Sequence, residues 1–455
     1  MNDLVAPTNI ETSFTNNEVM QMNIQENCKC GRKHIFSSQV IVGEGVLMQL
    51  PDLLKKYNSK KVFLIADQNT YQAAGKQVYE ILESSNVRIA SCIFGEDPLE
   101  PDEHSVGRAI MYYEADCDVV IGVGSGVIND ISKIVANVSG KPYIIVATAP
   151  SMDGYASATS SMTRDGLKIS LPSKCADVIL GDLNVLCNAP LKMMASGLGD
   201  MLAKYVSICE WRIANLITGE YYCEAVAQLV RDALRRCVDN AEGLLKRDKR
   251  AVKAVFEGLV IGGVAMAYAG VSRPASGVEH YFSHVWDMRG VEFGIPVDFH
   301  GIQCAMATYH AIKLYEIVKT QTPDYEKASA YAAAFDQSAW EQTLRQFLGK
   351  GAEAMIALEK KEGKYRKDTH PARFQIIADN WERILQIMDE ELPSSEEITK
   401  LLDTIGIPTD LTTIGVDTEC ARTTFKATKD IRDKYVLSRL AWDLGILDEL
   451  AGQIP

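Results

Sequence analysis

The sequence predicts an α/β domain with a mostly parallel, Rossmann-like sheet, followed by an all-helical domain. Between residues 61 and 182, short runs of apolar and β-branched residues alternate with segments of helical periodicity, which is typical of βαβ units. Beyond Pro190 the two-residue alternation ends and long stretches at helical spacing follow. The chain has 455 residues, more than the roughly 250–300 at which a single core stops growing, so we expect two domains.

The first domain is expected to contain five strands, three helices and one hairpin. The predicted strands are 60–67, 88–95, 117–124, 142–150 and 176–183, the helices are 71–82, 102–115 and 127–138, and the hairpin is 158–173. Long helical stretches at 191–215 and 220–247 open the second domain. The predicted boundaries are a flexible N-terminal tail at 1–27, the α/β domain at 28–190 and the helical domain at 191–455.

The charge balance argues against nucleic acid and membranes as partners. A net charge of −13 sets up a field that repels phosphate backbones and anionic lipid. The longest weakly polar run, 258–270, is shorter than the ~20 residues that span a bilayer and predicts a buried helix. Eleven cysteines without a framework spacing, and no signal peptide at the start, indicate reduced thiols in a cytoplasmic protein.

Two cysteines and a histidine near the N-terminal end resemble part of a metal site. Cys28, Cys30 and His34 all fall within "CKCGRKH". A structural zinc ion takes four ligands, and paired cysteines usually flank a longer spacer than the single residue found here. The favoured interpretation is therefore that no metal binds this segment.

A glycine-rich turn indicates a nucleotide site. Gly122, Gly124 and Gly126 in "VVIGVGSGVINDISK" follow a strand and precede a helix, where glycine lets the backbone approach a pyrophosphate. The alternative is that these glycines serve packing alone, since the spacing departs from G-x-G-x-x-G and the turn follows the third predicted strand rather than the first. At the end of the first strand, Asp67 either accepts hydrogen bonds from a ribose or caps a turn or helix.

Histidines gather in the helical domain. In "SGVEHYFSH", His280 and His284 are four residues apart and project from one face of a helix, and His300 follows a connection that can fold back on it. Catalytic divalent ions typically take three ligands from Asp, Glu and His, so Asp200, at the predicted start of an apolar helix, completes a set. The alternative is that Asp200 is an N-cap and the histidines are ordinary core or surface residues, but their grouping favours a metal.

Together these motifs resemble the iron-containing alcohol dehydrogenase superfamily, and within it the sn-glycerol-1-phosphate dehydrogenase family. "GVGSGVINDISK", "ATAPSMDGYASATSSMT", "GLGDMLAKY", "SGVEHYFSH" and "DFHGIQ" occur in the family's order and spacing, and "IRDKYVLSRLAWDLGIL" resembles the end of its bacterial branch. The resemblance implies a dehydroquinate synthase-like fold, with a dinucleotide-binding domain followed by a helical metal- and substrate-binding domain. Extra residues at the N-terminus and around 340–400 have no counterpart.

The resemblance also implies roles for single residues. Asp200, His280 and His300 would ligate the divalent ion, while His284 and Asp153 would act in catalysis. Asp153, Asp200 and His284 would also contact the substrate. The nicotinamide nucleotide would be bound by Asp67, Gly124, Ser125, Gly126, Val127, Ile128, Thr148, Ser151 and Ser157. For Thr148, Ser151 and Ser157, the alternative roles are loop capping and turn formation.

The implied reaction is the reversible reduction of dihydroxyacetone phosphate to sn-glycerol 1-phosphate, in a cytoplasmic homodimer that uses NAD(H) or NADP(H) and one Zn²⁺, Ni²⁺ or Fe²⁺ ion. The carboxylate of Asp67 should repel the 2′-phosphate of NADP, which favours NAD(H). Arg432 and Lys434 are candidates for binding the substrate phosphate, and the alternative is that they are surface charges. The alternatives are a glycerol dehydrogenase or 3-dehydroquinate synthase on the same fold, or a catalytically silent nucleotide-binding protein.

Overall fold

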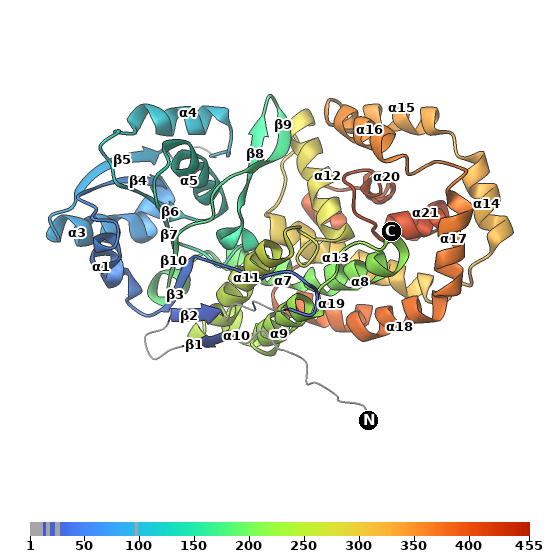
Figure 1. Ribbon diagram of the computed structural model, residues 1–455, viewed down its shortest axis with the longest axis horizontal. Coiled ribbons are helices and arrows are strands. Elements are labelled where there is room, and N and C mark those ends of the chain that lie inside the picture. The colour runs from blue at the N-terminus through green and yellow to red at the C-terminus, as the bar shows by residue number, and fades with distance from the viewer. Residues whose placement is uncertain (1–11, 15–18, 23–27, 96–98) are drawn as a thin grey trace. The chain divides into compact units, whose positions relative to one another are not determined.

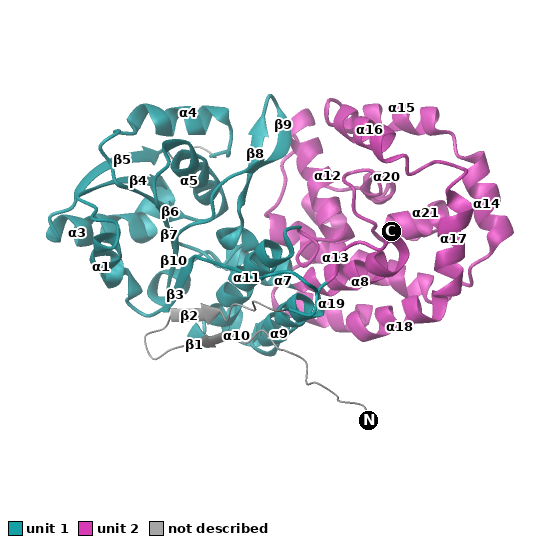
Figure 2. Ribbon diagram, viewed as in Figure 1, with its two compact units in different colours: residues 1–201, 223–271 teal, residues 202–222, 272–455 magenta. Residues whose placement is uncertain are grey.

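The computed structural model describes residues 12–14, 19–22, 28–95 and 99–455 (Figure 1). Contacts divide the chain into two compact units (Figure 2). Unit 1 comprises Met1–Met201 and Cys223–Val271, and unit 2 comprises Leu202–Tyr222 and Ser272–Pro455. In the predicted tail, residues 1–27, two segments are described: Thr12–Phe14 forms strand β1 and Val19–Met22 forms strand β2. The rest of the tail lies outside the described residues.

An eight-stranded sheet organises unit 1, in the order β1-β2-β3-β10-β7-β6-β4-β5. The six strands from β3 to β5 in this order pair in parallel, and only β1 and β2 are antiparallel. These six strands are β3 (Gln39–Gly43), β4 (Lys61–Asp67), β5 (Arg88–Phe94), β6 (Val119–Gly124), β7 (Tyr143–Ala147) and β10 (Val178–Asp182). A separate hairpin consists of β8 (Thr159–Arg164) and β9 (Leu167–Pro172). The predicted α/β class with a mostly parallel sheet is confirmed.

One strand of the parallel sheet was not predicted from sequence. Strand β3 pairs along its whole length with β10, the last strand of the sheet in chain order. It is short, so its five residues carry little periodicity. The glycine-rich turn after β6 consequently follows the fourth strand of the parallel part rather than the third.

Helices cover both faces of this sheet. Val62, Leu64, Val119 and Ile121 on one face share a core with helices α1 and α3. On the other face, a side chain at Gly122 would meet Ser132 of α5, and one at Gly181 would meet Phe256 of α11. Strands buried on both faces read as continuous apolar runs, which explains why the sequence showed them so clearly. The helices of unit 1 are α1 (Leu50–Lys55), α2 (Gln68–Thr70), α3 (Lys76–Ser84), α4 (Glu103–Tyr112), α5 (Gly126–Ser139), α6 (Leu183–Leu186), α7 (Leu191–Leu202), α9 (Glu224–Asp239), α10 (Ala241–Leu244) and α11 (Lys249–Ala269).

Among the described residues, α11 is the one helix long and apolar enough to cross a membrane. In the structure, 78% of its apolar window is buried inside the protein. It is therefore the buried helix that the run at 258–270 predicted.

Unit 2 is built from helices joined by loops. They are α8 (Lys204–Thr218), α12 (Val278–Phe293), α13 (His300–Val318), α14 (Tyr325–Ala334), α15 (Gln337–Leu348), α16 (Gly351–Glu362), α17 (His370–Asp379), α18 (Trp381–Glu391), α19 (Ser395–Thr404), α20 (Thr418–Thr428), α21 (Leu437–Asp443) and α22 (Leu447–Gly452). The helix predicted at 191–215 is two helices, α7 and α8, interrupted at Ala203.

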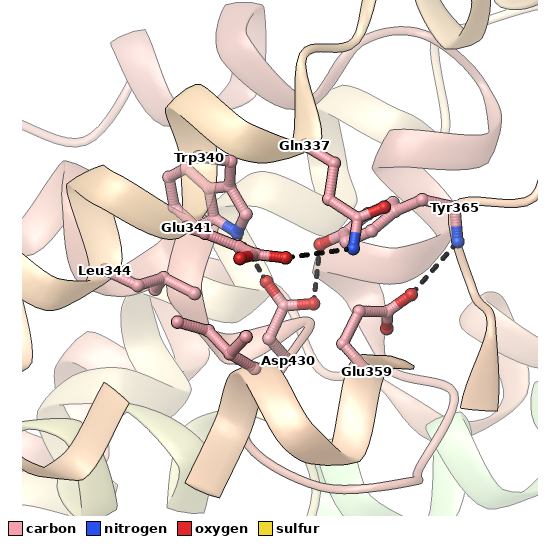
Figure 3. A pocket seen from close by; sticks show the side chains of 8 residues that line it. Gln337, Trp340, Glu341, Leu344, Glu359, Tyr365 and Asp430 are labelled. Carbon is pink, nitrogen blue, oxygen red and sulfur yellow. Dashed lines mark hydrogen bonds between the residues drawn. The ribbon is translucent and has the colours of Figure 1, made fainter. Parts of the chain in front are cut away.

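The extra residues around 340–400 pack within unit 2 and hold its loop 429–436. Trp340 and Tyr365 each donate a hydrogen bond to the buried carboxylate of Asp430, at 2.7 and 2.5 Å, beside a cavity of about 10 Å³ (Figure 3). The ammonium of Lys429 lies 3.6 Å from the centroid of the Trp340 ring. Lys364 donates to the backbone carbonyl of Arg432 at 2.6 Å. The added segment thus fixes the loop that carries Arg432.

Candidate active site

The predicted nucleotide-binding residues gather at one edge of the sheet. Strands β4, β6 and β7 are parallel neighbours, with Ile65 opposite Gly122 and Gly124 opposite Ala147. Asp67 and Gly124 each lie two residues further along their strands, so both stand at the carboxyl edge at the same level. Because β5 lies on one side of β4 and β6 on the other, the strand order reverses here. Open α/β sheets bind ligands outside the carboxyl ends of strands at such a reversal.

The glycine-rich turn brings β6 directly into α5. A β-carbon on Gly124 would lie 2.5 Å from that of Ile128, so only glycine fits this turn. Ser125 occupies the N-cap of α5, and its side chain makes no capping hydrogen bond. Its hydroxyl instead pairs with that of Ser151. The N-terminal N–H groups of α5 therefore lack a side-chain cap, which is the arrangement that binds phosphate in nucleotide folds.

The loop after β7 holds the remaining predicted nucleotide residues. The backbone N–H of Thr148 donates to the carbonyl of Gly124 at 3.1 Å, which ties this loop to the glycine-rich turn. Ser157 forms the turn contact expected of the alternative role, since its hydroxyl lies 2.9 Å from that of Thr159.

Asp67, at the end of β4, fills the capping role that was its alternative. It caps α2 by accepting a hydrogen bond from the backbone N–H of Thr70 at 2.8 Å. This cap occupies Oδ1 of Asp67.

Helix α7 packs tightly against the same loop and carries Asp200. A β-carbon on Gly197 would overlap the carbonyl oxygen of Pro150, so the helix approaches the loop at backbone distance. Ser196 donates to the carbonyl of Ser151 at 3.0 Å. The backbone N–H of Asp153 donates to Oδ2 of the fully buried Asp200 at 2.9 Å. Two motifs that are distant in sequence are thereby joined.

Asp200 lies in the last turn of α7 rather than at the start of a helix. The predicted position at a helix start is wrong, and so is the alternative that Asp200 is an N-cap. The carboxylate accepts a hydrogen bond from the backbone of the loop that carries Asp153.

The three histidines of the predicted cluster come together within unit 2. His280 and His284 are on α12, and His300 begins α13. The ring centroids are 5.0 Å apart for His280 and His300 and 6.1 Å apart for His284 and His300. Imidazole nitrogens of His280 and His300 and the sulfur of Cys304 lie within 4.8 Å of one another. The connection between α12 and α13 folds back as the sequence predicted.

Two neighbours orient the histidine rings for ligation. Nδ1 of His280 lies 2.8 Å from Oε1 of Glu279, and Nδ1 of His300 lies 2.9 Å from the hydroxyl of Ser283. A carboxylate only accepts hydrogen bonds, so it requires a proton on Nδ1 of His280 and leaves Nε2 as the ligating nitrogen. This is the outer-shell arrangement that metal-binding histidines use. The donor set fits a divalent transition metal such as Zn²⁺, Ni²⁺ or Fe²⁺.

His284 is kept neutral by its surroundings. Exclusion of water around the ring, followed by the positive charges of Arg432, His300, His280 and Lys434, holds the pKa of His284 well below its usual value. The two cations come from the loop 429–436, so basic groups are present beside the histidines. The pKa of Lys434 is also lowered, to about 7, by burial and by repulsion from Arg273 and Arg432.

Several residues of this site were not found from sequence. Glu279 directly precedes His280, and Ser283 lies three residues after it. Neither position in the sequence indicates that these side chains contact the histidine rings. Cys304 lies one helical turn after His300, a spacing that does mark a shared face. Glu210 accepts a hydrogen bond from the backbone N–H of Val278 at 2.9 Å, and burial, followed by repulsion from Glu279, raises the pKa of Glu210 to about 8.

Comparisons with known proteins place this architecture in a class. Residues 41–190 match the family model described as iron-containing alcohol dehydrogenase. The crystal structure of glycerol dehydrogenase from Schizosaccharomyces pombe aligns with a TM-score of 0.59 at 16% identity, covering 92% of both chains. At that identity the likeness concerns the fold alone. The fold is that of the iron-containing alcohol dehydrogenases.

Sequence relatives narrow the class. The chain is 29% identical over 388 residues to a glycerol-1-phosphate dehydrogenase, NAD(P)+, of Halalkalibacterium halodurans, covering 84% of this chain and 87% of that protein. It is 32% identical over 311 residues to the protein of the same name from Bacillus velezensis, covering 66% and 79%. The chain belongs to the glycerol-1-phosphate dehydrogenase family. The resemblance seen in the motifs is confirmed.

Proposed function

We propose that this enzyme catalyses the reversible, NAD(P)H-linked reduction of dihydroxyacetone phosphate to sn-glycerol 1-phosphate. The observation that carries the proposal is the histidine cluster of unit 2, with Nδ1 of both His280 and His300 held by neighbours and two cationic side chains close to His284. A metal-binding pair beside basic groups suits a phosphorylated substrate. The family names of the relatives point the same way.

The divalent ion is assigned to Asp200, His280 and His300. Nε2 of each histidine and a carboxylate oxygen of Asp200 are the donor atoms, and three protein ligands leave room for substrate oxygen. When bound there, the ion would supply Lewis-acid chemistry at the ketone oxygen. Glu279 and Ser283 keep the rings in the ligating orientation. Cys304 is a further soft donor near the pair.

His284 is assigned the role of proton relay. As a neutral imidazole it has one nitrogen that donates and one that accepts, so it can pass a proton to the product oxygen. Lys434 and Arg432 are assigned to the phosphate, whose charge would offset their mutual repulsion. Asp153 is assigned to the substrate hydroxyl, on a loop whose backbone N–H is bonded to Asp200.

The nicotinamide nucleotide is assigned to the carboxyl edge of the unit 1 sheet. Its pyrophosphate would meet the N–H groups of residues 125–128, and Thr148 and Ser151 would line the adjoining loop. Asp67 would accept from the ribose hydroxyls. Since Asp67→Asn keeps an oxygen that caps α2, it removes the negative charge without losing the cap. The ratio of kcat/KM with NADPH to that with NADH should rise in this variant, and an unchanged ratio would remove Asp67 from the assignment.

The decisive experiment is an NADH oxidation assay on metal-reconstituted protein with dihydroxyacetone phosphate, followed by chiral analysis of the product. Formation of sn-glycerol 1-phosphate is expected, with loss of turnover and of the catalytic ion, one ion per chain, in His280→Ala. Strong turnover of glycerol with no response to dihydroxyacetone phosphate would favour a glycerol dehydrogenase instead. Absence of any bound divalent ion after loading would favour a silent nucleotide-binding protein.

We further propose a cytoplasmic homodimer that interacts with neither nucleic acid nor membrane. The net charge of −13 supports the absence of polyanionic partners. Light scattering at several protein concentrations tests the dimer, and a monomer at all of them would refute it.

A further inference from the structure

We propose that Cys28, Cys30, His34 and Cys223 form a structural zinc site in unit 1, separate from the catalytic ion. The three cysteine sulfurs and one imidazole nitrogen all lie within 4.8 Å of one another. The sequence offered only three of these ligands, so a metal was not favoured there. The fourth, Cys223, comes from 195 residues beyond Cys28.

The spacing of the ligand atoms fits a tetrahedral ion. Zn–S bonds of about 2.3 Å and Zn–N bonds of about 2.0–2.1 Å imply tetrahedron edges of roughly 3.8 Å between sulfurs and roughly 3.5 Å between sulfur and nitrogen. The sulfurs of Cys28 and Cys223 are 3.6 Å apart. Nε2 of His34 lies 3.3 Å from the sulfur of Cys30 and 3.4 Å from that of Cys223. An ion therefore fits among these atoms with only small adjustments.

His34 is held with its ligating nitrogen toward the sulfurs. Its Nδ1 lies 3.2 Å from the backbone carbonyl of Tyr268, near the end of α11. A carbonyl only accepts hydrogen bonds, so the proton must be on Nδ1 and the lone pair on Nε2. This is the tautomer and outer contact that metal-bound histidines show. The ring is fully buried, so its orientation is fixed by the packing around it.

The backbone brings the four residues together from two directions. Gly31 adopts φ +78° and its N–H donates to the carbonyl of Cys28 at 2.9 Å, which closes a tight turn over residues 28–31 that contains both Cys28 and Cys30. Cys223 immediately precedes α9, where the N-terminal end of the helix dipole favours a thiolate.

Three cysteines and one buried imidazole place their ligand atoms within 4.8 Å of one another, and Cys28 and Cys223 are themselves buried. A coordinated thiol is deprotonated, so a divalent ion would balance the charge of the sulfurs that hold it.

The set of ligands is that of a closed site. Three sulfurs and one nitrogen complete four-coordinate zinc, with no position left for substrate, which distinguishes it from the proposed catalytic site. The ion would tie the segment 28–34 to the start of α9, next to the end of α11. Arg32 adds a hydrogen bond at 2.8 Å to the carbonyl of Ala269 in the same place. The site would therefore anchor the segment that leads into β3.

The test uses purified full-length protein carrying His280→Ala, which is expected to lose the catalytic ion. Elemental analysis should still find about one zinc per chain, and X-ray absorption should show three sulfur neighbours at about 2.3 Å and one nitrogen. Cobalt substitution should give thiolate-to-metal charge-transfer absorption. In the same background, Cys30→Ser and Cys223→Ser should lose this zinc and melt at a lower temperature. Cys420→Ser, at a half-buried cysteine of α20, is the matched control and should retain it.

The outcomes separate this site from the proposed function. Zinc held by sulfur in a protein without dehydrogenase activity would support the site and sink only the function. A His280→Ala protein without zinc, or with zinc bound by oxygen and nitrogen alone, would overturn the site. So would a disulfide between Cys28 and Cys223 in freshly purified protein, found by mass spectrometry. The absorption spectrum uses intact cysteines, so it decides the matter even where the cysteine variants fail to fold.

Discussion

Lys434 should make substrate affinity depend on pH. Its lowered pKa of about 7 lies about 3.5 units below the usual value for lysine, which corresponds to about 5 kcal/mol of cost for holding a buried charge beside Arg273 and Arg432. The neutral form dominates above that pH. A phosphate dianion binds the protonated form, so its binding must then recruit a proton.

The expected magnitude follows from that proton uptake. Substrate phosphate is already a dianion above about pH 7, so only the lysine titrates. From about pH 7 to about pH 8.5, the affinity for dihydroxyacetone phosphate should fall about 15-fold, which is the change in the protonated fraction of a group with a pKa near 7. Lys434→Met should abolish this slope and weaken binding about 10- to 100-fold at neutral pH, through loss of a charge-assisted hydrogen bond.

The assay is the KM for dihydroxyacetone phosphate across this pH range, together with calorimetric binding of sn-glycerol 1-phosphate to metal-loaded enzyme. Arg432→Met is the matched control: a guanidinium stays charged at every pH tested, so its loss should weaken binding without removing the pH dependence. Because Arg432 helps to lower the pKa of Lys434, the fall in affinity should begin at a higher pH in this variant. The KM for NADH reports on general damage to the site. A wild-type KM that does not change with pH, or a slope that survives Lys434→Met, would refute the reasoning.

Three further predictions concern stability and metal retention. Burial raises the pKa of Glu257 to about 7, so the folded state loses stability as pH rises from about 4.5 through 7. Glu257→Gln should therefore stabilise the protein by up to about 3 kcal/mol at pH 8 but little at pH 4.5. Equal gains in melting temperature at both pH values would contradict this. Glu279→Gln should weaken metal retention about tenfold in a chelator competition, and an unchanged dissociation constant would remove its orienting role. Gly197→Ala should lower the melting temperature sharply by pushing α7 off Pro150, whereas Gly107→Ala, where a β-carbon meets nothing within 4 Å, should not; similar effects of both would show that the close approach is unimportant.

Local patterns were enough to find much of the fold. Strands buried on both faces are written as apolar runs, as in "KVFLIAD", and their order along the chain with helices between them implies a parallel sheet. The histidine pair on α12 followed from the spacing of His280 and His284, since a helix repeats every 3.6 residues. Each of these signals is complete within about ten residues of sequence.

Features that depend on distant partners were lost or misplaced. The five residues of β3 form a strand because they pair with β10, which lies more than a hundred residues further along the chain. Asp200 was assigned to a helix start, and its actual role in bonding the N–H of Asp153 depends on the close contact of Gly197 with a loop.

The sequence by itself determined the fold class, the family and the identity of the chemical groups, because side-chain periodicity and motif order are properties of the chain. Only the tertiary structure decided which of these groups meet. Cys223 joins Cys28, Cys30 and His34, and Glu279 sets the tautomer of His280, because packing fixes distances between residues whose separation along the chain carries no information about them.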